Sequence, residues 1–273
     1  MKKANKELKK HTTSYIKAYE DVELLKHDDL RPVRMELETL KPEIYFRKKG
    51  VTDTIICFGS ARIAEPAIAK KNLETAKKEL AKKPKDKVLQ QKVKTAKGLL
   101  SLSKYYDEAR KFAKLVVEAA GDRFSIVTGG GPGIMEAANR GAYENGGRSI
   151  GLNITLPHEQ EPNPYITQNL AFLFHYFAIR KIHFVMRAQA CVVFPGGFGT
   201  FDELFEILTL IQTGKKNHIP VILVGKEFWN QVINVEALAK YGVIAPEDTH
   251  LCPIVETAQE AWNIIAKFHK LKK

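Results

Sequence analysis

The chain contains 273 residues, of which 44% are hydrophobic and 27% are charged. This composition excludes an intrinsically disordered chain, a collagen and a disulfide-rich scaffold, and the length suits one large α/β domain or two small ones. The unusual quantity is the net charge of +12, which by itself suggests nucleic acid or an anionic membrane surface as a partner.

The positive charge is concentrated in two segments. Residues 64–114 carry 15 basic and 6 acidic side chains, residues 1–17 carry 6 lysines and 1 glutamate, and the rest of the chain has a net charge of −2. Within 64–114, apolar residues recur at three- and four-residue spacings, which predicts two amphipathic helices interrupted at 83–86. We interpret this segment as a solvated, lysine-rich helical hairpin. Contact with nucleic acid or a membrane is the alternative, and it is disfavoured because residues 64–104 contain no aromatic side chain to stack on bases.

The cysteine pattern and the amino-terminal residues indicate in which cellular compartment the protein is expected. Cys57, Cys191 and Cys252 are widely spaced and lie mostly in apolar runs, which is typical of reduced, buried thiols. The lysines near the amino terminus are not followed by an apolar run, so no signal peptide is predicted. No stretch approaches the roughly 18 apolar residues of a membrane span. We therefore expect a cytoplasmic protein with no membrane contact and no metal site.

From residue 54 onward, short β-forming runs alternate with helical patterns. Continuous apolar runs such as 55–58 predict strands that are buried on both faces, as in a parallel sheet. We expect a Rossmann-like α/β fold over residues 51–273, a doubly wound parallel sheet with helices on both faces and the basic insertion at 64–114. Residues 1–50 are less regular and are expected to pack on this domain. The expected strands are 54–58, 124–128, 149–154, 190–194, 219–225 and, more weakly, 251–255, and the expected helices are 102–120, 133–146, 176–188, 201–213, 227–240 and 257–270.

Two of the expected strand-to-helix turns are rich in glycine. Gly129-Gly130-Gly131-Pro132-Gly133 follows strand 124–128, and Pro195-Gly196-Gly197-Phe198-Gly199-Thr200 follows strand 190–194. Glycine lets a ligand approach the backbone closely, and the amides at a helix N-terminus bind anions, phosphate most naturally. One such turn is often only a tight connection, but two that follow buried strands predict a phosphate site at the carboxyl edge of the sheet.

The turns do not match the best-known nucleotide motifs. Neither is followed by the Gly-Lys-Ser/Thr of a Walker loop, and neither reads GxGxxG. The first expected turn reads Phe58-Gly59-Ser60-Ala61-Arg62 instead. These sequences disfavour a nicotinamide or flavin dinucleotide and favour a mononucleotide or a sugar phosphate.

Two pairs of polar residues near the second turn have alternative interpretations. Thr200 and Glu203 form a Thr-x-x-Glu pattern, which fits a capping box at a helix start or a carboxylate placed near the ribose of a nucleotide. Arg180 and Lys181 precede strand 190–194 on an expected helix. Such a pair usually lies on a solvated face, but the apolar neighbours at 178, 179, 182, 184 and 185 disfavour that interpretation.

Together these elements resemble the Lonely Guy family, whose members are often mislabelled as lysine decarboxylases. The matching residues are Gly129–Met135, Arg180-Lys181 and Pro195–Glu203, and the resemblance covers roughly residues 50–240. The PGGxGTxxE element with its upstream Arg-Lys is the most specific part. The resemblance implies a Rossmann-like fold, a homodimer, and hydrolysis of a nucleoside 5′-monophosphate to a free base and ribose 5-phosphate. AMP, another purine or pyrimidine nucleotide, or a cytokinin riboside monophosphate would be the substrate.

The resemblance also assigns roles to residues. Arg180 and Glu203 match the catalytic pair, and no cofactor or metal is implied. The expected substrate-binding residues are Ser60, Gly129, Gly130, Gly131, Gly133, Met135, Lys181, Gly196, Gly197, Gly199 and Thr200. We find no motif for the pyridoxal phosphate that lysine decarboxylation would require. A non-catalytic carrier of a nucleotide or of the molybdenum cofactor is the alternative, because it would use both glycine turns without needing Glu203.

Two features depart from the family pattern. The Met-His that often precedes Arg-Lys is replaced by Phe177-Ala178-Ile179, so the base pocket is expected to differ, with Phe177 and His183 as candidate lining residues. The insertion at 64–114 is longer than in compact members and resembles that of a larger bacterial subtype. Specificity for cytokinins is therefore not carried over, and the preferred base is not predicted.

Overall fold

The computed structural model describes residues 13–157 and 161–271. Seven parallel strands form one sheet in the order β4-β3-β2-β1-β5-β6-β7, which confirms the predicted α/β class. The strands are β1 (Thr54–Phe58), β2 (Ser125–Thr128), β3 (Ser149–Ile154), β4 (Ala171–Phe174), β5 (Ala188–Val193), β6 (Val221–Val224) and β7 (Ile254–Val255). The α-helices are α2 (Val22–Lys26), α3 (Arg31–Lys48), α4 (Pro66–Lys82), α5 (Lys87–Leu102), α6 (Lys104–Ala120), α7 (Ile134–Glu144), α8 (Phe177–Met186), α9 (Phe198–Gln212), α10 (Lys226–Val232), α11 (Val235–Lys240) and α12 (Ala258–Phe268).

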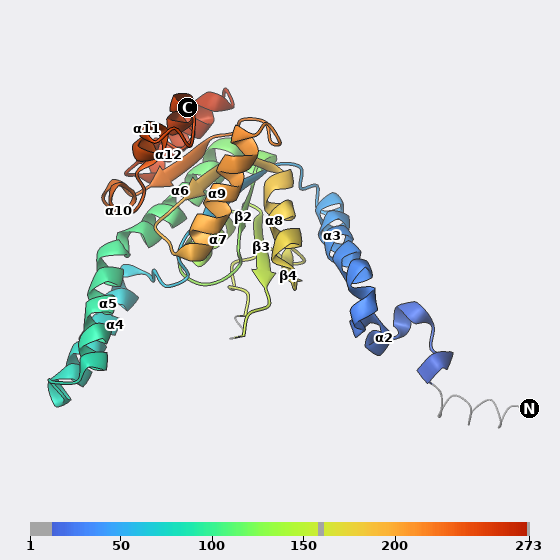
Figure 1. The fold of residues 1–273 in the computed structure, drawn as a ribbon, viewed down its shortest axis with the longest axis horizontal. Coiled ribbons are helices and arrows are strands. Elements are labelled where there is room, and N and C mark those ends of the chain that lie inside the picture. The colour runs from blue at the N-terminus through green and yellow to red at the C-terminus, as the bar shows by residue number, and fades with distance from the viewer. Residues whose placement is uncertain (1–12, 158–160, 272–273) are drawn as a thin grey trace, which may run out of the picture.

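Helices cover both faces of the sheet (Figure 1). Successive strand residues pack in opposite layers. In β1, Ile55 packs in the layer formed by α6, α7 and α12, whereas Ile56 packs in the layer that includes α8, α9 and the end of α3. Both side chains are fully buried. This two-sided burial explains why the strands are continuous apolar runs instead of alternating ones.

The structure differs from the predicted elements in several places. Residues 31–48, which were expected to be less regular, form the long helix α3. Strand β4 was not predicted; it is a short edge strand in which only alternate side chains are buried. Strand β7 has two residues instead of five. The helix expected at 227–240 is two helices, because the chain breaks at Ile233 and the side chain of Asn234 caps α11 by accepting from the Ala237 N–H. Short edge elements carry weak periodicity, so the sequence signal for them is poor.

Helices α4 and α5 form a hairpin that extends away from the sheet (Figure 1). The two arms pack on each other through a small apolar cluster of their own, which includes Leu73, Ala76 and Val93. The turn lies at 83–86, where the Asp86 side chain accepts hydrogen bonds from the first N–H groups of α5. Most of the lysines lie on the solvent side of this hairpin, as their spacing predicts.

Helix α3 lies on the other side of the molecule from the hairpin (Figure 1) and contacts α8. Pro42 and Phe46 are its buried residues, and they face β4 and α8. Cys57, Cys191 and Cys252 are buried and form no disulfide, as expected. Among residues 13–157 and 161–271, no helix has the length and apolar character needed to cross a membrane.

Candidate functional site

Three strand-to-helix turns meet at the carboxyl edge of the sheet, because β2, β1 and β5 are neighbours in it. The strand order reverses between β1 and β5, and this switch point is where open α/β sheets bind ligands. The Ser60 N–H donates to the Pro195 carbonyl (3.0 Å), and the Ile134 N–H donates to the Ser60 carbonyl (3.1 Å). The backbone of Ser60 thus holds the two glycine-rich turns beside each other.

The turn after β2 requires glycine at two positions. Gly130 and Gly133 have φ angles of +73° and +71°. A Cβ on Gly130 would lie 2.1 Å from Asn153 Oδ1, and one on Gly133 would lie 2.4 Å from the Ser60 carbonyl oxygen. Both the backbone angle and the close approach exclude a side chain there.

A buried polar network fixes the shape of this turn. The Thr128 hydroxyl accepts from the Gly130 N–H (2.9 Å) and donates to Asn139 Oδ1 (2.6 Å). The Asn163 amide donates to the Gly131 carbonyl (3.0 Å) and to Asn139 Oδ1 (2.8 Å). Because these groups satisfy one another away from water, the network makes the turn rigid. The sequence did not indicate a role for Asn139 or Asn163. The available signal for Asn139 was a polar residue on the buried face of α7, and Asn163, which lies in a loop, had none.

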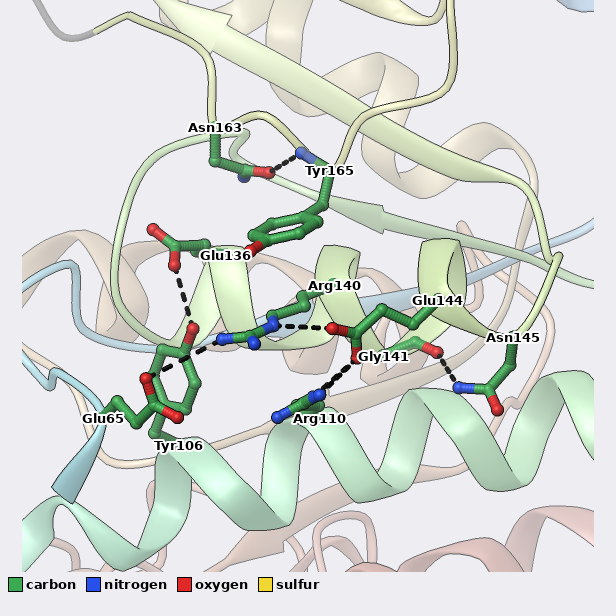
Figure 2. A network of polar contacts seen from close by, with 10 residues as sticks. All are labelled: Glu65, Tyr106, Arg110, Glu136, Arg140, Gly141, Glu144, Asn145, Asn163 and Tyr165. Atoms are coloured by element: carbon green, nitrogen blue, oxygen red, sulfur yellow. Dashed lines mark hydrogen bonds and ion pairs between the residues drawn. The ribbon is translucent and has the colours of Figure 1, made fainter. Parts of the chain in front are cut away.

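A second network holds α7 against α6 (Figure 2). Arg110 on α6 pairs with Glu144 on α7 (2.6 Å), while Arg140 pairs with Glu144 within α7 (2.8 Å) and with Glu65 before α4 (3.8 Å). The Tyr106 hydroxyl donates to Glu136 on the first turn of α7 (2.9 Å). Both networks therefore act on the same short helix, whose N-terminus borders the glycine turn. Met135, also on its first turn, has its sulfur beside Gly129.

Exchanging a glycine that the turn requires should cost stability. We expect Gly130→Ala to lower the free energy of unfolding by about 3 kcal/mol, because the new Cβ is both strained and in contact with Asn153. Gly199→Ala is the matched control: a Cβ there meets nothing within 4 Å, and the site is helical. It should keep the free energy of unfolding or raise it by up to about 1 kcal/mol. Urea denaturation measures both changes, and equal losses would contradict the geometry.

The turn after β5 leads directly into α9, which begins three residues earlier than predicted. Gly197 is the N-cap, and no side chain caps the helix. The capping-box alternative for Thr200 and Glu203 is therefore wrong: Thr200 lies within the first turn, almost buried beside Gly196. The N–H groups of a first turn have no acceptor within the helix. A Cβ on Gly197 or Gly199 would meet nothing within 4 Å, so there is space beside these donors.

Arg180 on α8 donates a hydrogen bond to Glu203 on α9, and the two form an ion pair. The two side chains are only 9% and 13% exposed. Burial raises the pKa of Glu203 to about 7, although Arg180 acts in the opposite direction. The Arg180 guanidinium also lies 5.3 Å from the ring centroid of Phe184 and 5.6 Å from that of Phe177.

The ion pair lies between the two glycine turns. A Cβ on Gly129 would be 3.9 Å from Arg180 Nη2, while Glu203 follows the turn after β5 by two helical turns at most. Lys181 points to α9 as well, with its Nζ 3.3 Å from Asp202 and 3.6 Å from Glu206. A solvated Arg-Lys face is therefore wrong for this pair.

Helix α3 holds α8 at both of its ends. At the N-terminus, the Glu38 carboxylate accepts from the backbone N–H groups of His175 (2.8 Å) and Tyr176 (3.2 Å). At the C-terminus, Glu43 binds Arg187 through two hydrogen bonds of 2.6 and 2.5 Å. Arg180 therefore lies on a helix whose position is fixed by α3, and not by the glycine turns alone.

His183 does not line a base pocket, contrary to the sequence-based expectation. It is buried between α8 and α3, and burial lowers its pKa. Its Nε2 lies 3.2 Å from the carbonyl oxygen of Glu38. That oxygen has no helical donor because the residue four positions later is Pro42, which lacks an N–H. Phe177 remains a candidate for the pocket, since it is half exposed beside Arg180.

Known proteins are similar to the part of the chain that carries this site. The family model described as "Possible lysine decarboxylase" matches residues 135–265. A rice protein named "Probable cytokinin riboside 5'-monophosphate phosphoribohydrolase LOGL3" (Oryza sativa subsp. japonica) is 27% identical over 169 residues, 60% of this chain and 77% of the relative. The "Pyrimidine/purine nucleotide 5'-monophosphate nucleosidase" of Escherichia coli strain K12 is 33% identical over 112 residues.

The extent of these matches differs. The E. coli match covers 37% of this chain and only 24% of that enzyme. Among solved structures, the X-ray structure of TM1055 has a TM-score of 0.48 and 19% identity over 79% of this chain and 99% of its own. The family match and the named relatives agree with the Arg-Lys and PGGxGTxxE elements of the site, and they support the resemblance to the Lonely Guy family.

Proposed function

We propose that this protein hydrolyses the N-glycosidic bond of a nucleoside 5′-monophosphate. The observation that carries the proposal is the buried Arg180–Glu203 ion pair, which lies next to an uncapped helix N-terminus and two glycine-rich turns. The names of the relatives, a phosphoribohydrolase and a nucleotide nucleosidase, support the same reaction. The products would be a free base and ribose 5-phosphate.

Each part of the site has a role in this reaction. The free N–H groups at the start of α9, with Thr200, would bind the 5′-phosphate. Cleavage of the C1′–N bond builds positive charge on the ribose, as in glycoside hydrolysis. Glu203 would stabilise that charge and accept a proton from the water whose oxygen bonds to C1′. Arg180 would stabilise the negative charge on the departing base until the base takes up a proton.

A substrate panel tests the proposal. Purified protein is incubated with AMP, GMP, CMP, UMP and a cytokinin riboside monophosphate, and the free base is quantified by chromatography. We expect release from at least one nucleotide, with an equal amount of ribose 5-phosphate. Tight nucleotide binding with no base release, unaffected by Glu203→Gln, would instead support a non-catalytic carrier. The corresponding nucleosides are the control, because they lack the phosphate that α9 would bind.

The pH dependence of the rate follows from the pKa of Glu203. A glutamate that must be ionised to accept a proton would lose activity as the pH falls below its pKa. We expect kcat/KM to fall about tenfold per pH unit below about 7, the raised pKa, and not below the ordinary value of 4.5. Initial rates between pH 5 and 9 measure this limb.

The substrate phosphate also titrates, with a second pKa of about 6. The residual rate of Glu203→Gln separates the two effects, because the phosphate titration would remain in that variant while the limb near 7 would disappear. A wild-type profile that stays flat from pH 5 to 9 would contradict the assigned role of Glu203.

A further inference from the structure

The carboxylate of Glu38 on α3 caps the N-terminus of α8. It accepts from the backbone N–H groups of His175 and Tyr176, the two residues that precede the helix. A negative charge at this end of a helix also interacts favourably with the helix dipole. The N-cap residue of α8 itself, Tyr176, makes no side-chain capping bond. The cap is therefore supplied by a residue 138 positions earlier in the chain.

Tyr176 connects this cap to Arg180. The Arg180 N–H donates to the Tyr176 carbonyl (3.1 Å), and this is the first hydrogen bond of the helical repeat. The Tyr176 hydroxyl also accepts from Arg34 Nε on α3 (3.4 Å). Helix α3 thus holds Tyr176 by its backbone and by its side chain, and Tyr176 in turn holds the backbone of Arg180.

The guanidinium of Arg180 has few polar contacts of its own. Among residues 13–157 and 161–271, its hydrogen-bond partner is Glu203, and its Nε is buried without a partner. The rings that it contacts, Phe177 and Phe184, lie on α8 as well. Because these rings move with the same helix, a shift of α8 would change the separation of Arg180 and Glu203 directly.

We propose that Glu38 is a positioning residue for the Arg180–Glu203 pair and that it acts through the backbone of Tyr176. The proposal rests on the function proposed above for this pair. Without the Glu38 carboxylate, the N-terminus of α8 moves away from its present position and takes Arg180 with it. Arg180 then stabilises the departing base less well, and Glu203 loses the neighbour that favours its ionised form.

The charge of Glu203 reports where Arg180 lies. Burial raises the pKa of Glu203, and Arg180 is the largest opposing influence. Lys181 on α8 also lowers this pKa and would move together with Arg180, whereas Asp202 on α9 raises it. On β5, burial raises the pKa of the Cys191 thiol well above its usual value, so this neighbour stays neutral. Displacement of α8 should therefore raise the pKa of Glu203 further.

The kinetics of Glu38→Ala test the proposal. We expect kcat to fall about tenfold at pH 9, because a small displacement of a stabilising group is costly. At pH 7 it should fall about fivefold more, since a pKa raised by about one pH unit leaves fewer Glu203 side chains ionised. KM should change by less than about threefold, because the start of α9 that would bind the phosphate is not altered.

Three further variants serve as controls. Glu38→Gln keeps an oxygen that can accept from the same N–H groups and should restore most of the rate at both pH values. Glu36→Ala lies on the exposed side of α3 and should leave the rate unchanged. Glu38→Asp keeps the charge but has a shorter reach. It replaces the alanine variant if that variant does not fold, and it should shift the rate in the same direction.

Titration of Glu203 separates this proposal from the proposed reaction. Carbon-13 NMR of carboxyl-labelled glutamate, with the signal assigned from Glu203→Gln, should give a pKa of about 7 in the wild type. The value should be about one pH unit higher in Glu38→Ala. Ile265→Val, buried on α12 in the opposite layer, is a destabilised control that should leave this pKa unchanged.

An unchanged pKa and rate in Glu38→Ala would overturn the positioning role. So would an equal pKa shift in Ile265→Val, which would make the effect a general loss of stability, or equal damage in Glu38→Gln. A wild type that releases no base would overturn the proposed reaction alone, because the titration requires no turnover.

Discussion

Replacing Glu203 by glutamine should lower kcat by about 10³-fold, the range expected when a positioned acid–base group is lost. The amide keeps the size of the side chain and can still accept from Arg180, but it cannot take up a proton. Base release from the preferred nucleotide, at saturating substrate and pH 8, measures the effect. Asp202→Asn is the matched control: it removes the neighbouring carboxylate, which is 55% exposed and lies beside Lys181, and should leave kcat within about threefold.

The same variant separates a catalytic role from a structural one. Because burial raises the pKa of Glu203 above its unfolded value, the folded state binds this proton more tightly than the unfolded state. The group therefore stabilises the fold below pH 4.5, and this contribution is lost as the pH rises through about 7. A neutral glutamine should not lower the melting temperature at pH 8. A large loss of stability there, with activity preserved, would mean that Glu203 serves only to hold α8 to α9.

Arg180→Ala is expected to abolish turnover and also to weaken the fold, which distinguishes it from the change at Glu203. It leaves a buried carboxyl without its cation, and breaking such a pair typically costs about 3–5 kcal/mol. The pKa of Glu203 would rise further, so more of the carboxyl would be protonated at neutral pH. The destabilisation should consequently be larger at pH 8 than at pH 6.

Two measurements check this expectation. Thermal unfolding at both pH values follows the stability, and base release follows the activity. Arg180→Lys keeps the charge without the planar group that contacts Phe177 and Phe184. It should retain the fold while losing most of the rate. If Arg180→Ala were equally stable at pH 6 and pH 8, the ion pair would not control the charge of Glu203.

The sequence predicted best those features that depend on residues adjacent in the chain, such as a buried strand or a glycine-rich turn. The apolar run of β1 indicated burial on both faces, and the glycines before α7 and α9 indicated close backbone approach. The contact between Arg180 and Glu203 joins residues 23 positions apart. The sequence could suggest this contact only through the family resemblance, because spacing along the chain does not determine which helices adjoin.

Other features depended on tertiary contacts. Thr200 and Glu203 fit a capping box by pattern, yet α9 begins at Phe198, with Gly197 in an extended conformation as its N-cap. His183 looked available for a base, yet the carbonyl left free by Pro42 accounts for its position. The position of His183 could not be predicted without knowing that α3 lies along α8.

The hairpin of α4 and α5 has a consequence for local stability. Its arms are held by a small cluster around Leu73, Ala76 and Val93, separate from the two layers that cover the sheet. A unit with so few buried contacts opens more often than the domain unfolds. Amide hydrogens in α4 and α5 should therefore exchange with solvent deuterium well before those of β1 and β5. The hairpin can fray, change in length or accept new residues while the strands and turns at the carboxyl edge keep their geometry.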